Sequence, residues 1–210
     1  MIISDQTLSR ERAATTRRRS ARQEELLDAL ETIVLSEGFG GLTVGDLARR
    51  LSCSRSTLYA LAPSKEELFL ALEERLLNRV QATAQACAER ETDPTKRLIG
   101  YIAGAIESVR DVGTPYLAEV SAYAPARQLL AEFQRTTISQ LRTLIEAGIA
   151  EGAFHALNAR LAAEVLDAAV SRIQDPRVLA ETGLTASEAL EHVSQLLTQG
   201  LLKPPARRRR

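Results

Sequence analysis

Apolar residues recur at intervals of three and four positions along most of the chain, the spacing that gathers side chains on one face of an α-helix. The first such stripe is Leu26, Leu27, Leu30, Ile33 and Val34. Further stripes occur in five later segments, within residues 68–80, 98–109, 129–145, 161–173 and 190–201. No segment alternates between apolar and polar residues over a useful length, as a half-buried strand would. The pattern therefore predicts an all-α protein of about nine helices.

Local signals predict where the first three helices begin and end. Glycines at positions 38, 40 and 41 stop the first helix. Thr43, with Asp46 three residues later, is typical of a capping box that opens a short second helix. Ser54 can cap a third short helix, because its hydroxyl can accept from a free backbone N–H. The residues around Cys53 then form a tight turn between the two short helices.

Capping residues and prolines divide the rest of the chain in the same way. A capping box of Ser64 and Glu67 predicts a long fourth helix over residues 64–90. Later helices are expected to begin at Asp93-Pro94, Thr114-Pro115, Pro125, Asn158 and Thr185-Glu188. The three N-terminal helices, the fourth helix and these five later helices make up the expected nine.

The composition is that of a globular protein without a membrane-spanning segment. Of the 210 residues, 45% are hydrophobic and 26% are charged, which are ordinary values. No apolar run approaches the ~20 residues that a transmembrane helix needs, and the arginine-rich residues 1–22 do not resemble a secretory signal. We therefore expect a cytoplasmic protein with no membrane partner. Cys53 and Cys87 lack the spacing of a disulfide framework or a zinc site, so free thiols and no metal are expected.

The formal net charge is zero, but the charges are unevenly distributed. Residues 1–65 hold ten basic and eight acidic residues, residues 66–206 hold thirteen and nineteen, and residues 207–210 are four arginines. A polyanion would be attracted to the two ends of the chain and repelled by its middle. Charge runs are also common in solvated tails, and residues 207–210 are interpreted as such a tail.

Residues 43–67 carry the most informative pattern. Two short helices are unstable in isolation and have to pack on the first helix. Packing of their apolar residues leaves one outward face on the third helix, formed by Arg55, Ser56, Thr57 and Tyr59. A helix with such a face fits the major groove of DNA, where an arginine can read guanine edges.

Other residues of this region suit the phosphate backbone. The hydroxyls of Ser54, Thr57 and Tyr59 are natural donors to phosphate oxygens. Thr43 and Lys65 lie at the N-termini of two helices, where free N–H groups and the helix dipole favour phosphate. The sequence therefore predicts a helix-turn-helix DNA-binding domain.

Three blocks of this region also match a known pattern, namely Thr43-Val44-Gly45-Asp46-Leu47-Ala48, Ser54-Arg55-Ser56-Thr57-Leu58-Tyr59 and Pro63-Ser64-Lys65-Glu66-Glu67-Leu68. Over about residues 22–80 the chain resembles the DNA-binding domain of TetR-type transcriptional regulators. The resemblance implies a homodimer that places the recognition helix of each subunit, Ser54 to Leu61, in successive major grooves of a pseudo-palindromic operator. The DNA contacts that it implies are Thr43, Arg55, Ser56, Thr57, Tyr59 and Lys65.

The sequence departs from the TetR-type pattern in two ways. Leu61-Ala62 stands where an aromatic pair often follows the tyrosine of the recognition helix, which removes aromatic packing near the start of the fourth helix. Cys53 replaces the small β-branched residue that is common in the turn, a conservative change for a buried side chain.

The resemblance also divides the chain into parts. Residues 21–66 form the homeodomain-like helix-turn-helix domain, and residues 67–203 form a ligand-binding and dimerisation domain that the fourth helix links to it. Residues 1–20 are interpreted as a basic flexible arm and residues 204–210 as a basic tail. Because the arm precedes a DNA-binding domain, its arginines and Arg22 are expected near the phosphate backbone, with a solvated arm as the alternative.

The second domain supplies two sets of candidate residues. The resemblance implies that the last two helices build a dimer interface, although their apolar faces could equally close the core of one subunit. The candidate interface residues are Leu161, Val165, Ala169, Leu190, Val193 and Leu197. A small-molecule pocket is expected between the fourth and seventh helices, where bundles keep cavities. Its candidate lining residues are Tyr101, Tyr116, Glu119, Tyr123 and Phe133.

An enzyme is not expected. The two histidines, His155 and His192, have neither metal-ligand spacing nor a neighbouring nucleophile, and no phosphate-binding loop is present, so no cofactor is predicted. The leading hypothesis is a homodimeric repressor that an unknown small-molecule effector releases from its DNA operator. An activator of the same fold and a helical protein-binding scaffold that does not bind DNA are the alternatives.

Overall fold

The computed structural model describes the backbone of residues 5–201 and the side chains of residues 21–200. This part of the chain forms helices and contains no strand, so the all-α prediction is confirmed. The ten helices are α1 (Asp5–Glu37), α2 (Val44–Arg50), α3 (Arg55–Tyr59), α4 (Lys65–Glu89), α5 (Pro94–Ser108), α6 (Thr114–Ala122), α7 (Ala124–Ala150), α8 (Ala159–Ile173), α9 (Pro176–Thr182) and α10 (Ala186–Leu201). None of these helices is both long enough and apolar enough to span a bilayer.

Two helices differ from the sequence-based expectation. α9 was not expected, although Asp175 caps it and Pro176 occupies its first turn, the same combination that predicts α5. α1 begins at Asp5 rather than near residue 21, so its backbone covers most of the stretch interpreted as a flexible arm. The side chains of Arg17, Arg18 and Arg19, and the whole of the basic tail at 204–210, lie outside the described residues.

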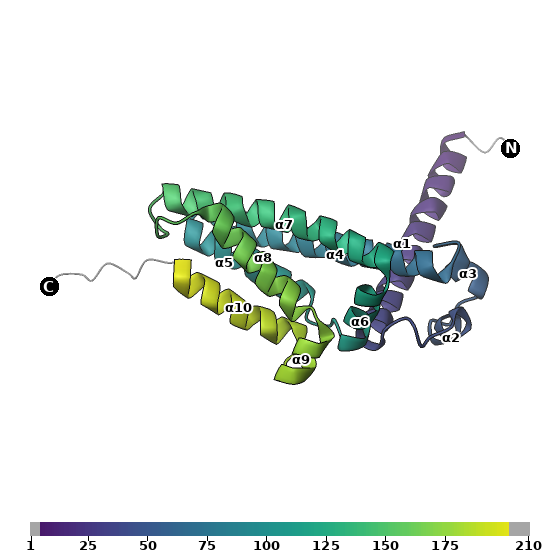
Figure 1. Cartoon of the computed structure of the whole chain (residues 1–210). Helices are drawn as coiled ribbons and strands as arrows, with labels where there is room; N and C mark the ends of the chain where they lie inside the picture. Colours follow the sequence, from purple (N-terminus) through teal and green to yellow (C-terminus); the bar gives the residue numbers. More distant parts are fainter. Residues whose placement is uncertain (1–4, 202–210) are drawn as a thin grey trace.

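The N-terminal helices form a small head at one end of the molecule (Figure 1). α1 ends where Gly38 adopts a left-handed conformation with φ +81°, which a glycine tolerates without steric penalty. Leu30 and Val34 of α1, Leu47 of α2 and Leu58 of α3 are each no more than 1% exposed. These four residues pack α1, α2 and α3 into one unit, as the helix-turn-helix prediction requires.

The larger part of the chain is a helical bundle in which α4, α5 and α7 run side by side, with α8 and α10 along one flank (Figure 1). Its core contains Leu98 and Tyr101 of α5, Ile145 of α7 and Phe154 of the following loop, each at most 2% exposed. Burial of such side chains stabilises a fold by ~1.5–3 kcal/mol each. This core is separate from that of the head.

The head core does not end with α3. It continues into α4 through Phe69 and Leu72 and into α6 through Tyr116 and Val120. Phe69 stacks on Phe39 with ring centroids 5.6 Å apart and meets Tyr116 edge-on at 5.5 Å. The head therefore depends on α4 and α6 for part of its hydrophobic core.

An ionic cluster also fixes α1 against α4. The carboxylate of Glu31 is buried, with its side chain 3% exposed, and accepts from Arg75 and Arg79 of α4. Arg75 also pairs with Glu24 and Asp28 of α1. A buried carboxylate is tolerated only where it is paired in this way, so the contact specifies how α1 and α4 lie on each other.

Candidate nucleic-acid interface and its link to the helical bundle

Helix α2 is closed at its N-terminus by a complete capping box. The Asp46 backbone N–H donates to the Thr43 hydroxyl at 3.1 Å, and the Thr43 backbone N–H donates to the Asp46 carboxylate at 3.0 Å. The Thr43 hydroxyl also donates to the Asp46 carboxylate at 2.5 Å. This bond, the one from the Thr43 backbone N–H and the charge of Arg49 hold the pKa of Asp46 below its usual value. Thr43 is thus engaged in capping, while its exposed position at the start of α2 stays open to solvent.

A tight turn joins α2 to α3. Ser52 adopts a left-handed conformation with φ +50°, and the Cys53 backbone N–H donates to the Ala48 carbonyl at 2.9 Å. The Cys53 side chain is half-buried against the head core, and burial raises the pKa of its thiol. This environment fits the conservative role that the sequence suggested for Cys53.

Helix α3 begins at a network of hydroxyl groups. Ser54 caps the helix by accepting from the Thr57 backbone N–H at 3.1 Å. Its hydroxyl also lies 2.7 Å from that of Ser56 and 2.8 Å from that of Thr57. Leu58 alone of this helix is buried, and Tyr59 is 49% exposed. All five residues that the sequence assigned to the outward face or cap of α3 are therefore accessible.

A groove of about 900 Å³ lies between the start of α3 and helix α1. Arg22 of α1 lines it together with Ser54, Ser56 and Thr57. The structure thus brings Arg22 close to three of the predicted recognition residues. Arg50, which sequence analysis did not single out, lines the same groove and forms an ion pair with Glu37 at 2.7 Å.

Lys65 lies apart from this groove, on the other side of the head. Its ammonium nitrogen donates to the Gly40 carbonyl at 3.3 Å and lies 5.0 Å from the centre of the Phe39 ring. Both contacts join the first turn of α4 to the loop after α1. An ammonium group has three donors, so these contacts leave Lys65 with donors for a further acceptor.

The head matches a known family. Residues 26–72 match the family described as bacterial regulatory proteins, TetR family. The match covers α2, α3, the turn between them and the parts of α1 and α4 that pack on them.

The whole chain also has the fold of TetR-type regulators. It superimposes on a transcriptional regulator from Saccharomonospora viridis with a TM-score of 0.70 and 16% identity, over 88% of this chain and 100% of that one. A TetR-family regulator from Agrobacterium tumefaciens superimposes with a TM-score of 0.68 and 17% identity, over 88% of this chain and 99% of that one. The reduced form of NemR from E. coli superimposes with a TM-score of 0.66 and 20% identity, again over 88% of this chain and 99% of that one. No curated protein matches the sequence.

Helix α6 joins the TetR-type head to the bundle. The carboxylate of Glu119 accepts from the backbone N–H groups of Phe39 at 2.6 Å and Gly40 at 2.5 Å. At the other end of α6, the Gly113 backbone N–H donates to the Leu35 carbonyl at 2.7 Å. Glu119, proposed from sequence as a pocket residue, therefore bonds the loop after α1.

Tyr116 and Glu73 form a buried hydrogen-bonded pair between α6 and α4. The Tyr116 hydroxyl donates to the Glu73 carboxylate, and the two residues are 1% and 2% exposed. Burial raises the pKa of Glu73 to about 7, although the bond from Tyr116 opposes the rise. Burial and the negative charge of Glu73 raise the pKa of Tyr116. Glu73 was not singled out by sequence analysis, because its partner lies 43 residues away.

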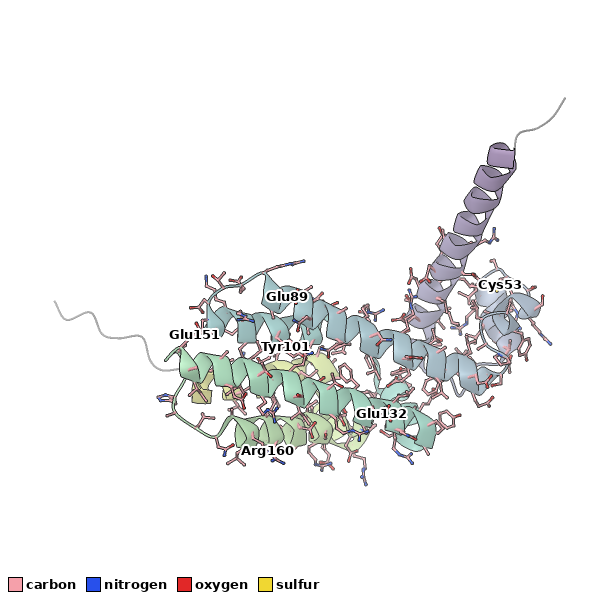
Figure 2. All side chains as sticks on the ribbon, turned by 90° about the horizontal axis from the view of Figure 1, so that it is seen from above. Cys53, Glu89, Tyr101, Glu132, Glu151 and Arg160 are labelled. Carbon is pink, nitrogen blue, oxygen red and sulfur yellow. The ribbon has the colours of Figure 1, made fainter. Side chains whose placement is uncertain are left out.

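Tyr101 lies in a different place, inside the bundle and far from Cys53 of the head (Figure 2). Burial raises the pKa of its hydroxyl, and the neighbouring side chains of Gln81 on α4 and Thr137 on α7 partly offset the rise. Among the described residues, the buried oxygens Gln81 Oε1 and Thr137 Oγ1 are the two that lack a hydrogen-bond partner. Buried polar atoms without partners are rare and call for an explanation.

The five candidate pocket residues therefore fall into two groups. Tyr116, Glu119 and Tyr123 lie where α6 meets the head, a region called here the joint. Tyr123 packs there near Phe69, with ring centroids 6.3 Å apart. Phe133 of α7 packs on the same cluster, whereas Tyr101 belongs to the core of the bundle. Helical periodicity predicts that an aromatic residue is buried. It does not predict which of the two cores the residue joins, because α4 and α7 contribute to both cores.

An exposed apolar stripe runs along α8 and α10. Leu161 and Val165 of α8 are 62% and 60% exposed, and Leu196 of α10 is 74% exposed. Of the other candidate interface residues, Ala169 and Leu190 are half-buried, and Val193 and Leu197 pack on the core of the bundle. Sequence analysis missed Leu196, because it assigned the outward role to the adjacent Leu197.

The raised pKa of Glu73 predicts a pH-dependent stability. Its folded pKa of about 7 exceeds the ordinary 4.5, so its contribution to stability is full below pH 4.5 and is lost as the pH rises through 7. Replacement Glu73→Gln removes this titration. From pH 4 to pH 8 the natural protein should therefore lose ~3 kcal/mol of unfolding free energy relative to the Glu73→Gln variant.

Urea denaturation across this pH range measures the effect. The matched control is Glu74→Gln, since Glu74 is the exposed neighbour of Glu73 on α4. A difference for Glu73→Gln that does not vary with pH would show that the pKa of Glu73 is the same in the folded and unfolded states.

Proposed function

We propose that the protein is a homodimeric repressor that binds a pseudo-palindromic operator and is released by a small-molecule effector. The observation that carries the proposal is the exposed polar face of α3, held on a head of the TetR type. We assign residues 21–66 to the DNA-binding domain and residues 67–203 to the effector and dimerisation domain, with α4 common to both.

In this proposal α3 enters the major groove. Arg55 and Tyr59 are exposed and reach bases or the adjacent phosphates, and Ser54, Ser56 and Thr57 supply hydroxyl donors at the start of the helix. The hydroxyl network explains why these small residues occur together, because it orients each hydroxyl before DNA arrives. Thr43, Lys65 and Arg22 contact phosphates around this helix and fix its register.

The exposed stripe of α8 and α10 supports the dimer. Leu161, Val165 and Leu196 are large apolar residues at more than half exposure, and such residues in one patch mark an interaction surface. Pairing of two copies through this stripe would bury it and set the two recognition helices about 34–36 Å apart, the repeat of successive major grooves.

The buried polar atoms at Tyr101 support an effector site within the bundle. The Tyr101 hydroxyl has Gln81 Oε1 and Thr137 Oγ1 beside it and can donate to only one of them, so a bound molecule with a hydrogen-bond donor would serve the other. The regulator from Saccharomonospora viridis that shares this fold was solved in complex with choline, which supports a small-molecule effector here. A molecule that separates α4 from α7 would also strain α6, whose Glu119 bonds the head. The effector then shifts the dimer from one distance between its two heads to another, at which the two α3 helices no longer match successive major grooves, and DNA is released.

Loss of the outward face of α3 should abolish specific DNA binding. The double replacement Arg55→Ala and Tyr59→Ala removes two exposed side chains, so the fold is retained and each lost base or phosphate contact weakens binding by ~1–3 kcal/mol. The probe is a duplex that the natural protein selects from a random-sequence pool, and the measurement is fluorescence anisotropy over a range of salt concentrations.

Arg90→Ala is the control, because Arg90 lies at the end of α4 beside Glu89, far from the head (Figure 2). It should bind the selected duplex as the natural protein does. Unchanged affinity of the double variant for that duplex would refute the assignment of α3, and failure of the natural protein to select any duplex would refute DNA recognition itself.

The apolar stripe predicts the oligomeric state. Leu161→Glu together with Val165→Glu places two charges in the proposed interface, so the natural protein should sediment as a dimer and the variant as a monomer with unchanged helicity. Ile99→Glu, at an apolar residue of α5 that is 44% exposed, is the matched control and should remain a dimer. A double variant that still sediments as a dimer would contradict the proposed interface.

A further inference from the structure

Three arginines belong to the helix-turn-helix, and two of them are neutralised by carboxylates. Arg49 pairs with Asp46 at 3.1 Å, and Arg50 pairs with Glu37 at 2.7 Å. Arg55, the first residue of α3, has no carboxylate within ion-pairing distance in the described part of the chain. Its charge is therefore not offset by a neighbouring acid, and something other than an ion pair determines where its guanidinium lies.

The guanidinium of Arg55 lies against the backbone of α2 at Gly45. A Cβ atom added to Gly45 would come within 2.8 Å of Arg55 Nη2 and 3.2 Å of both Cζ and Nε. The nearest atoms to that position are thus all three from the guanidinium of Arg55, which lies close to α2 at Gly45. The space that a side chain would occupy at position 45 is filled by Arg55.

Glycine is otherwise a poor choice at this position. Gly45 is the second residue of a seven-residue helix, and glycine is among the weakest helix formers. The backbone of α2 does not require glycine there, since Gly45 is not among the residues with positive φ. What the absent side chain provides is the close approach of Arg55.

We infer that Gly45 is a positioning residue for DNA recognition: its missing side chain lets the Arg55 guanidinium lie against α2, where it is pre-oriented for a base. This inference rests on the proposed function of α3. A guanidinium confined before binding loses less side-chain freedom when it meets the base. Gly45 thereby acts on sequence specificity through Arg55 without touching DNA itself.

Replacement Gly45→Ala tests the inference. The added methyl group displaces only the end of a flexible side chain, and alanine favours the helix, so the variant should fold with an unchanged or higher Tm. Its affinity for the duplex selected by the natural protein should fall about threefold to tenfold. Affinity for a random duplex should stay the same, because the charge of Arg55 is kept.

A double-mutant cycle distinguishes an action through Arg55 from an independent one. In an Arg55→Ala background, Gly45→Ala should have no further effect on affinity for the selected duplex. Gly41→Ala is the matched control, because Gly41 lies in the same head and a Cβ there would meet nothing within 4 Å. It should leave affinity unchanged.

Each outcome decides the matter. Equal affinity of Gly45→Ala and the natural protein overturns the inference, as does an equal loss from Gly45→Ala in the presence and absence of Arg55. If Arg55→Ala binds the selected duplex normally while the natural protein still selects it, α3 does not use this arginine and the inference fails with the proposed function intact. If the natural protein selects no duplex, the proposed function and the inference both fail.

Discussion

The bond between the Glu119 carboxylate and the two backbone N–H groups after α1 is the contact on which the arrangement of the two parts of the molecule depends. Phe39 and Gly40 lie in the loop that ends α1 and leads into α2, and both donate to one side chain of α6. Hydrogen bonds to a charged acceptor are about twice as strong as neutral ones. A movement of α6 must therefore move this loop or break both bonds, so the position of the recognition helix is tied to the bundle.

The surrounding contacts fix how α1, α4 and α6 are oriented at this joint. Phe69 of α4 packs between Phe39 of the head and Tyr116 of α6, and Tyr116 donates to the buried Glu73 of the same α4. Glu31 of α1 also binds α4 through Arg75 and Arg79. Helix α4 is thus held to α1 by ion pairs and to α6 by a buried hydrogen bond. A small head whose core is completed by α4 and α6 gains both stability and a defined orientation from these neighbours.

Local signals in the sequence predicted the elements well, while tertiary contacts decided most of what they missed. The Thr43–Asp46 box and the Ser54 cap are formed as expected, since a cap involves residues three apart. The missed α9 has the same kind of start, with Asp175 as its cap and Pro176 in its first turn, so a local signal for it was present in the sequence. For the candidate sites, position on a helix indicated that Tyr101, Tyr116 and Glu119 face inward. Their partners, Gln81, Glu73 and the Phe39 amide, lie on other elements, and no local pattern reveals them. Arg55 and Gly45 are likewise ten residues apart, on two helices whose crossing angle the sequence does not specify.

Amide hydrogen exchange at Phe39 and Gly40 tests the joint most directly. In the natural protein both amides should exchange slowly, because each donates to the Glu119 carboxylate. In Glu119→Ala both should exchange much faster, while the Cys53 amide, which donates to the Ala48 carbonyl within the head, keeps its protection. Fast exchange of Phe39 and Gly40 in the natural protein, or unchanged protection in the variant, would contradict the view that α6 holds the head through Glu119.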